Sequence, residues 1–249
     1  MSTRRTGTTR SRAAATVAKP TDGPFGLDAT AKRKLIFVAV FIAYFATIWL
    51  LWNTPVVYPL KVFVVLLHEV SHGLAAVATG GAIRRITLTL DQGGTCLCPG
   101  GNAFVTLSAG YLGSVAWGAL LLVLATGRIS RHRIALGIIG GLLAAMTVLY
   151  IRNLFGLGFG LAAGFALIAL ARWRRPAVHR AALTVLGLTS CLYAILDIKS
   201  DIIDRPELRS DAAMLAELTH VPTAVWGVLW IGIALTVAVL LVRRSFARA

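Results

Sequence analysis

The sequence contains few charged residues and very few acidic ones. Of its 249 residues, 14% are charged, 57% are hydrophobic, and only 10 are Asp or Glu. A soluble domain carries about 25% charged and about 45–50% apolar residues. The deficit of charge excludes an ordinary water-soluble domain, and the mean hydropathy of +0.77 points to a membrane protein. We expect one multi-pass membrane domain over residues 31–249, preceded by a disordered basic tail over residues 1–30.

Cysteine is equally scarce, with three residues in the chain. This number excludes a small domain held together by a disulfide framework. Cys96 and Cys98 are too close in sequence to bridge comfortably and lack the spacing of a zinc knuckle. Cys191 stands alone in an apolar run, where a cysteine acts as a small buried hydrophobic residue.

The basic residues outnumber the acidic ones and give a formal net charge of +15. They lie in the N-terminal tail and in short clusters at the ends of apolar runs, namely 32–34, 84–85, 128–133, 172–175 and 243–244. Flanks of this kind hold helices against anionic headgroups and set their orientation. We therefore expect the lipid bilayer as a partner and no nucleic acid.

Seven apolar runs have the length of about 17–23 residues that crosses a hydrocarbon core. They cover residues 35–52, 60–79, 103–125, 134–150, 154–171, 181–198 and 223–242. The third is rich in small residues, which allow close helix contact. The sequence thus predicts an all-α integral membrane protein with about six or seven transmembrane helices. Seven crossings would place the two basic termini on opposite faces, so either one run is re-entrant or one basic cluster departs from the positive-inside tendency.

A short β-hairpin is predicted between the second and third runs. Residues 86–90 alternate apolar and polar side chains, and residues 91–94 have the composition of a turn. Residues 104–107 are either the returning strand or already part of the next helix. Such a hairpin could bind an extended substrate by strand addition, or it could be a structural loop.

The second run contains the motif His68-Glu69-Val70-Ser71-His72. Four residues apart on a helix, His68 and His72 project from one face and can reach one Zn²⁺. Glu69 is placed to take a proton from the attacking water and to pass it to the leaving amine. Ionisable residues inside a membrane span are costly and are read as functional. The alternative is a polar trio that joins helices by hydrogen bonds without a metal.

A hydrolytic zinc site needs a third protein ligand. The remaining histidines lie at helix ends or in a loop, which leaves the carboxylates as candidates. Asp197, at the end of an apolar run, is our first choice, and Asp201, one helical turn later, is its rival. Asp204 and Asp211 are interpreted as part of a solvated acidic loop. We expect one zinc ion per chain, held by His68, His72 and Asp197.

Several segments carry a family resemblance: His68 to Ala76 with Thr79-Gly80-Gly81, Ala109 to Ser114, and Asp197 to Asp201 followed by Ser210-Asp211-Ala212. They resemble the site-2 protease class of intramembrane zinc metalloproteases, and in detail its peptidase M50B-like branch. The resemblance implies cleavage of transmembrane or membrane-adjacent peptide bonds, with Glu69 as base, His68 and His72 as ligands and an Asp as third ligand. It also suggests a bacterial cell membrane. Better-known members place that Asp directly before Gly, whereas Asp197 precedes Ile198.

Two other functions are compatible with the motif. The chain could be a membrane scaffold that keeps the motif without turnover. It could also be a small transporter that uses the intramembrane charges as a relay, although a transporter is expected to contain a repeat of spans and none is found. We expect a transmembrane protein as the substrate. The sequence specifies neither the identity of that substrate nor the oligomeric state.

Overall fold

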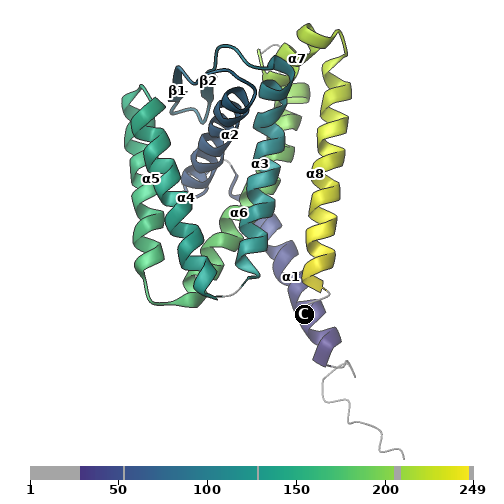
Figure 1. Cartoon of the computed structure of the whole chain (residues 1–249). Helices are drawn as coiled ribbons and strands as arrows, with labels where there is room; N and C mark the ends of the chain where they lie inside the picture. The colour runs from purple at the N-terminus through teal and green to yellow at the C-terminus, as the bar shows by residue number, and fades with distance from the viewer. Residues whose placement is uncertain (1–28, 53, 128, 205–208, 247–249) are drawn as a thin grey trace, which may run out of the picture.

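The structure, a computed structural model, describes residues 29–246 apart from 53, 128 and 205–208. Its elements in chain order are α1 (Ala29–Leu50), α2 (Tyr58–Ala78), β1 (Arg85–Leu88), β2 (Gly94–Leu97), α3 (Ala103–Ala125), α4 (Ile129–Tyr150), α5 (Leu154–Arg172), α6 (Pro176–Lys199), a π-helical turn (Ser200–Asp204), α7 (Asp211–Thr219) and α8 (Thr223–Phe246) (Figure 1). Among the described residues, seven helices are long and apolar enough to cross a membrane. The predicted all-α membrane fold with a small hairpin is confirmed. The predicted N-terminal tail falls on residues outside the description, except for Ala29 and Thr30, which begin α1.

Helix α2 forms the centre of the bundle. Every residue from Lys61 to Gly73 is buried, because α2 packs against α3, α5, α6 and both strands. A helix that is apolar on all sides is stable only when it is enclosed, and the run Val62–Leu67 meets that condition. The enclosure removes the polar side chains of the motif from lipid.

Helix α3 contacts its neighbours through glycines, as the small-residue composition predicted. A Cβ at Gly113 would collide with the Ser71 side chain on α2, and one at Gly118 would lie 2.8 Å from the Gly187 carbonyl on α6. The Trp117 indole also donates to Ser71 Oγ at 3.2 Å. These contacts fix α3 closely against both helices.

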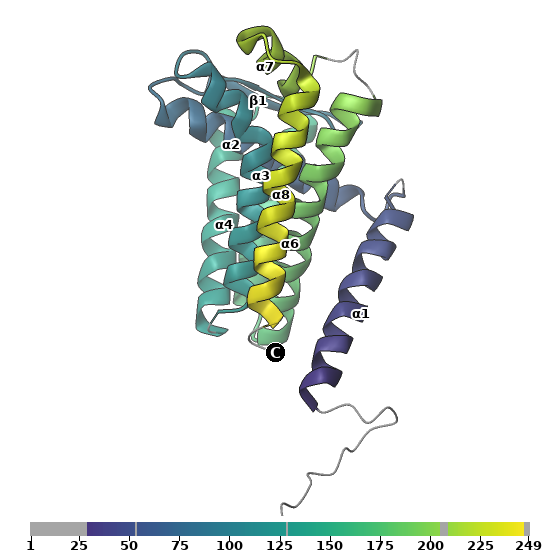
Figure 2. The ribbon, with the colours of Figure 1, turned by 90° about the vertical axis from the view of Figure 1, so that its right-hand side faces the viewer.

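The helix ends divide into two groups at opposite ends of the molecule. The start of α1, the α3–α4 and α5–α6 connections and the end of α8 lie at the lower end of Figures 1 and 2. The hairpin, the α4–α5 connection and α7 lie at the upper end, which we call the hairpin end. Helix α2 runs across the bundle, at a steep angle to the long helices (Figure 2).

The strands form a two-stranded antiparallel sheet in which Ile86 pairs with Cys96. The returning strand is Gly94–Leu97, whereas residues 104–107 belong to α3, so the helical alternative for those residues is the one observed. On the other side of β1, Ile86 bridges Ile151 in parallel, and the Asn153 side chain bonds both the N–H and the C=O of Leu88. The hairpin is thereby attached to the α4–α5 connection.

Cys96 and Cys98 are joined by a disulfide, which corrects the expectation that they would not bridge. Residues two apart on an extended strand point to the same face, so the sequence separation that argued against a bond also brings the two side chains together. Cys191 carries a free thiol beside Gly118 and is half-buried, less enclosed than the small buried residue that we expected.

Candidate metal centre

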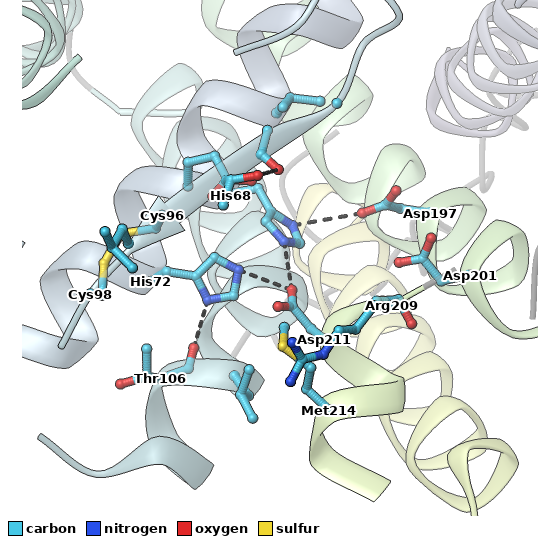
Figure 3. Close-up of a pocket in the computed structure, with 18 of the residues that line it drawn as sticks. His68, His72, Cys96, Cys98, Thr106, Asp197, Asp201, Arg209, Asp211 and Met214 are labelled. Atoms are coloured by element: carbon cyan, nitrogen blue, oxygen red, sulfur yellow. Dashed lines mark hydrogen bonds and ion pairs between the residues drawn. A yellow bond between two sulfur atoms is a disulfide. The ribbon is translucent and has the colours of Figure 1, made fainter. Parts of the chain in front are cut away.

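Three side chains from two distant segments converge on one point (Figure 3). Asp211 Oδ2 lies 3.0 Å from His68 Nε2 and 2.9 Å from His72 Nε2. Among the described residues these three form the one group of His, Cys, Asp or Glu that could hold a metal ion. Two histidines and a carboxylate are the ligand set of many catalytic zinc sites.

Asp211 is the first residue of α7, and its position is set by a helix cap. Ser210 is the N-cap, and its Oγ accepts from the Ala213 N–H at 3.3 Å. The Asp211 side chain is only 14% exposed, which corrects our interpretation of this residue as part of a solvated loop. Burial alone would raise the pKa of its carboxyl, but the neighbouring His72 and His68 hold that pKa well below its usual value.

Helix α7 is fixed in turn by its contacts with α3, α6 and α8. Ala212 and Leu215 are fully buried in one cluster with Tyr111, Ile198 and Trp230. The Trp226 indole on α8 donates to Thr219 Oγ1 at 3.2 Å. The carboxylate is therefore carried by a packed element.

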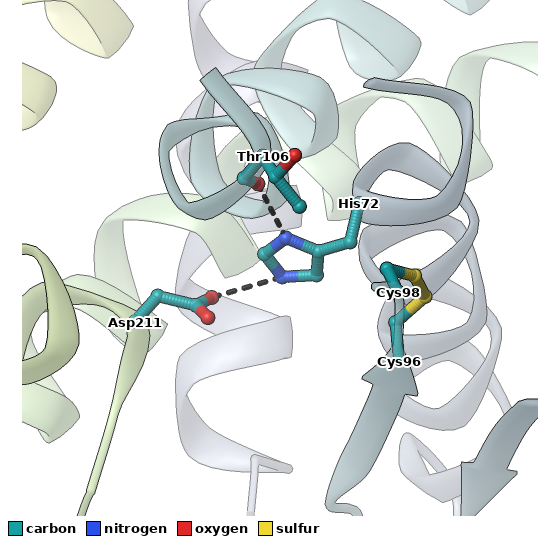
Figure 4. Close-up of a disulfide and its surroundings, with 5 residues drawn as sticks. All are labelled: His72, Cys96, Cys98, Thr106 and Asp211. Carbon is teal, nitrogen blue, oxygen red and sulfur yellow. Dashed lines mark hydrogen bonds and ion pairs between the residues drawn. A yellow bond between two sulfur atoms is a disulfide. The ribbon is translucent and has the colours of Figure 1, made fainter. Parts of the chain in front are cut away.

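The hydrogen bond of His72 determines which of its nitrogens faces the cluster as a ligand. His72 Nδ1 lies 2.7 Å from the Thr106 carbonyl oxygen (Figure 4). A carbonyl only accepts, so Nδ1 carries the proton and, in the neutral ring, Nε2 holds a lone pair. That lone pair and the ionised Asp211 oxygen repel each other at 2.9 Å unless a proton or a cation lies between them. One divalent cation would satisfy all three side chains.

The predicted ligand Asp197 lies on the other side of the His68 ring. Its Oδ2 is 3.7 Å from His68 Nδ1, a buried nitrogen with no hydrogen-bond partner among the described residues. The structure thus does not bring Asp197 into the group that contains both histidines, because the end of α6 faces Nδ1 and α7 faces Nε2. A carboxylate behind a ligating imidazole orients the ring and raises its basicity.

The rival ligand Asp201 accepts a hydrogen bond from the Tyr111 hydroxyl at 2.5 Å. The Tyr111 ring in turn stands edge-on to His68, with centroids 5.3 Å apart. Asp201 therefore contacts the cluster through Tyr111. The side chain of Asp204 lies outside the described residues.

Glu69 is buried beside the cluster, under the hairpin. A Cβ on Gly94 would lie 2.5 Å from Glu69 Oε1, so only glycine allows β2 to pass this close to the carboxylate. The hairpin predicted from sequence alternation is thus part of the site.

Gly110 on α3 provides the space in which the two imidazole nitrogens meet. A Cβ at this position would lie 2.5 Å from His72 Nε2 and would collide with His68 Nε2. Zinc binds imidazole nitrogen at about 2.0–2.1 Å. A methyl group would hence fill the space toward which both Nε2 atoms point, and the residues present fit a small cation.

The site opens into a cavity of about 970 Å³ at the hairpin end. The cavity is lined by the motif side chains, by residues 91–101 of the hairpin and its flanks, and by Asp197, Asp201, Arg209 and Asp211. A space of this size accommodates several residues of an extended peptide.

The Peptidase M50B-like family model matches residues 41–241. Comparisons with curated proteins and with solved structures gave no match. The matched range includes all of α2 and α7 and so both parts of the cluster. Together with the seven apolar helices, this match shows that the chain is a multi-pass membrane protein that belongs to the Peptidase M50B-like family of metallopeptidases.

Proposed function

We propose that the protein is a zinc-dependent intramembrane endopeptidase that cleaves transmembrane or membrane-adjacent peptide bonds. The observation that carries the proposal is the convergence of His68 Nε2, His72 Nε2 and Asp211 Oδ2, with Glu69 buried next to them. In a chain of a metallopeptidase family, this arrangement is the set of groups that peptide hydrolysis requires. His68, His72 and Asp211 would hold the ion.

A zinc ion bound there would supply Lewis-acid polarisation and a water of lowered pKa. Glu69 takes the proton of the attacking water on its carboxylate and delivers it to the nitrogen of the leaving amine. Thr106 fixes the ring of His72 through Nδ1, and Asp197 faces the corresponding nitrogen of His68. The motif side chains are buried, and the lowered local dielectric strengthens their electrostatic interactions.

The position of β2 supports an extended peptide as substrate. Strand β2 has β1 on one side and the cavity on the other, and it reaches the site at Glu69. A peptide added along this strand would pass directly over the carboxylate. This position favours the strand-addition role of the hairpin over a purely structural one.

The proposal is tested by zinc content and cleavage measured on the same purified full-length variants. Wild type should contain about one zinc per chain, and His68→Ala should contain none. Glu69→Gln should retain zinc while cleavage of a co-expressed single-span membrane protein falls by about 10²–10⁴-fold. Glu217→Gln, a matched change on the exposed face of α7, should alter neither quantity. Zinc-free wild type, or full cleavage by Glu69→Gln, would refute the proposal.

The same variants, with an uptake assay added, separate the two alternatives. A scaffold without turnover would bind zinc and cleave nothing, whereas a transporter would show uptake that depends on Glu69. The arrangement favours hydrolysis over transport, because the ionisable groups of the motif, together with Asp197, Asp201 and Asp211, line one cavity at the hairpin end instead of forming a path through the bundle.

A further inference from the structure

The described charges are divided unevenly between the two ends of the bundle. The end opposite the hairpin carries basic residues at each of its helix ends, in the first turns of α1 and α4, at the end of α5, at the start of α6 and at the end of α8. These residues are Lys32, Arg33, Lys34, Arg131, Arg133, Arg172, Arg174, Arg175, Arg180 and Arg243. The hairpin end carries fewer basic residues, namely Arg84, Arg85, Arg152, Lys199 and Arg209, and the described carboxylates belong to α2 or lie toward this end. Short basic connections remain in the cytoplasm.

The path of the chain removes the conflict that seven crossings created. Helix α1 begins at the end opposite the hairpin and stops about half-way up the bundle, and α2 continues from there to the hairpin end, where α3 begins (Figures 1 and 2). Together α1 and α2 therefore carry the chain across once, and the direction then alternates through α3, α4, α5, α6 and α8. With six crossings, the start of α1 and the end of α8 lie on the same face (Figure 1), and both are basic.

The disulfide is a second observation, independent of charge. The bond joins Cys96 on β2 to Cys98 just after the strand, at the hairpin end and beside the cavity. Disulfides persist in oxidising compartments outside the cytoplasm and are rare within it. Charge and redox chemistry therefore assign the same side to the hairpin end.

We propose that the catalytic cavity opens to the non-cytoplasmic side of the membrane, and that the substrates are membrane proteins with an accessible peptide bond at the non-cytoplasmic end of a span. The choice of substrate rests on the proposed proteolytic function, whereas the orientation does not. Residues of the hairpin and α7 line the mouth of the cavity, so a substrate span approaching from the cytoplasmic end would have to be drawn through most of the bilayer to reach Glu69.

Orientation can be measured without any cleavage. In full-length protein with all three cysteines changed to Ser, single cysteines are introduced as Leu90→Cys at the hairpin turn, 70% exposed, and as Arg174→Cys in the exposed α5–α6 connection. A membrane-impermeant maleimide added to intact cells should label Leu90→Cys, and Arg174→Cys should react only after lysis. The reverse pattern, labelling of both, or labelling of neither before lysis would overturn the orientation. A fluorescent protein fused after Ala249 of the otherwise unchanged chain should fluoresce, and a dark full-length fusion would overturn it too.

Substrate class is tested with two otherwise identical single-span proteins. One carries a Gly-Pro break at the non-cytoplasmic end of its span and the other carries it at the cytoplasmic end. We expect cleavage of the first only, lost in Glu69→Gln. Cleavage of the second alone, or of both equally, would overturn the inference while leaving proteolysis intact. Cleavage of neither by zinc-loaded wild type would refute the proposed function, and the labelling pattern would still decide the orientation.

Discussion

Gly110→Ala tests the metal centre most directly, because the added methyl group would lie where the two histidine nitrogens meet. Its carbon would stand 2.5 Å from His72 Nε2 and would press on His68 as well. Non-bonded carbon and nitrogen atoms approach to about 3.5 Å, so the rings must retreat by about 1 Å. Metal–ligand distances hold to about ±0.2 Å. We expect zinc affinity to fall by at least about 10–100-fold, the range known for perturbed ligand orientation.

The assay is chelator competition on purified protein, with thermal unfolding recorded in parallel. Gly113→Ala is the matched control on the same helix, because its methyl group would crowd Ser71 on α2 and spare the imidazoles. Gly141→Ala on α4 meets nothing within 4 Å and controls for substitution itself. Gly113→Ala should lose stability and keep zinc, whereas Gly110→Ala should lose zinc. Wild-type zinc affinity in Gly110→Ala, or equal loss in Gly113→Ala, would refute the assignment of this space to an ion.

Three further predictions concern the carboxylates, the tyrosine and the packing of the bundle. Asp211→Asn should remove zinc, whereas Asp197→Asn should retain it with about 10–100-fold weaker affinity, and equal zinc contents would contradict these roles. Tyr111→Phe removes the hydrogen bond that Tyr111 donates to Asp201 and should lower the free energy of unfolding by about 1–3 kcal/mol, with zinc still bound; an unchanged melting temperature would argue against the bond. Gly164→Ala would place a Cβ 3.0 Å or less from backbone atoms of α4 and should destabilise the helix pair by about 1–3 kcal/mol, whereas Gly158→Ala faces open space and should not; thermal unfolding distinguishes them.

Most of the helices and half of the site could be predicted because their signals are local. An apolar run long enough to span lipid and a motif with both histidines on one helical face need no tertiary information. The hairpin was predictable for the same reason, since alternation and turn composition are adjacent in sequence. These elements agree with the structure to within a few residues.

The third carboxylate of the cluster could not be found in this way. Asp197 follows an apolar run and looks intramembrane, whereas Asp211 stands in a polar segment and looks solvated. Only the folding of α7 back onto α3 buries Asp211 against the histidines. The one local signal was Ser210 directly before Asp211, a helix start that places a carboxylate in the first turn. The path of α2 across the bundle was similarly hidden, because length and hydropathy do not fix tilt.

The bond between the Trp226 indole and Thr219 has a mechanical consequence. It couples the helix that bears Asp211 to α8, a helix with many lipid-facing side chains. A span adjusts its tilt when the hydrocarbon layer becomes thicker or thinner, and here such tilting would move a ligand oxygen relative to two nitrogens on an enclosed helix. The ion affinity that we propose for the centre should therefore respond to the acyl-chain length of the surrounding lipid.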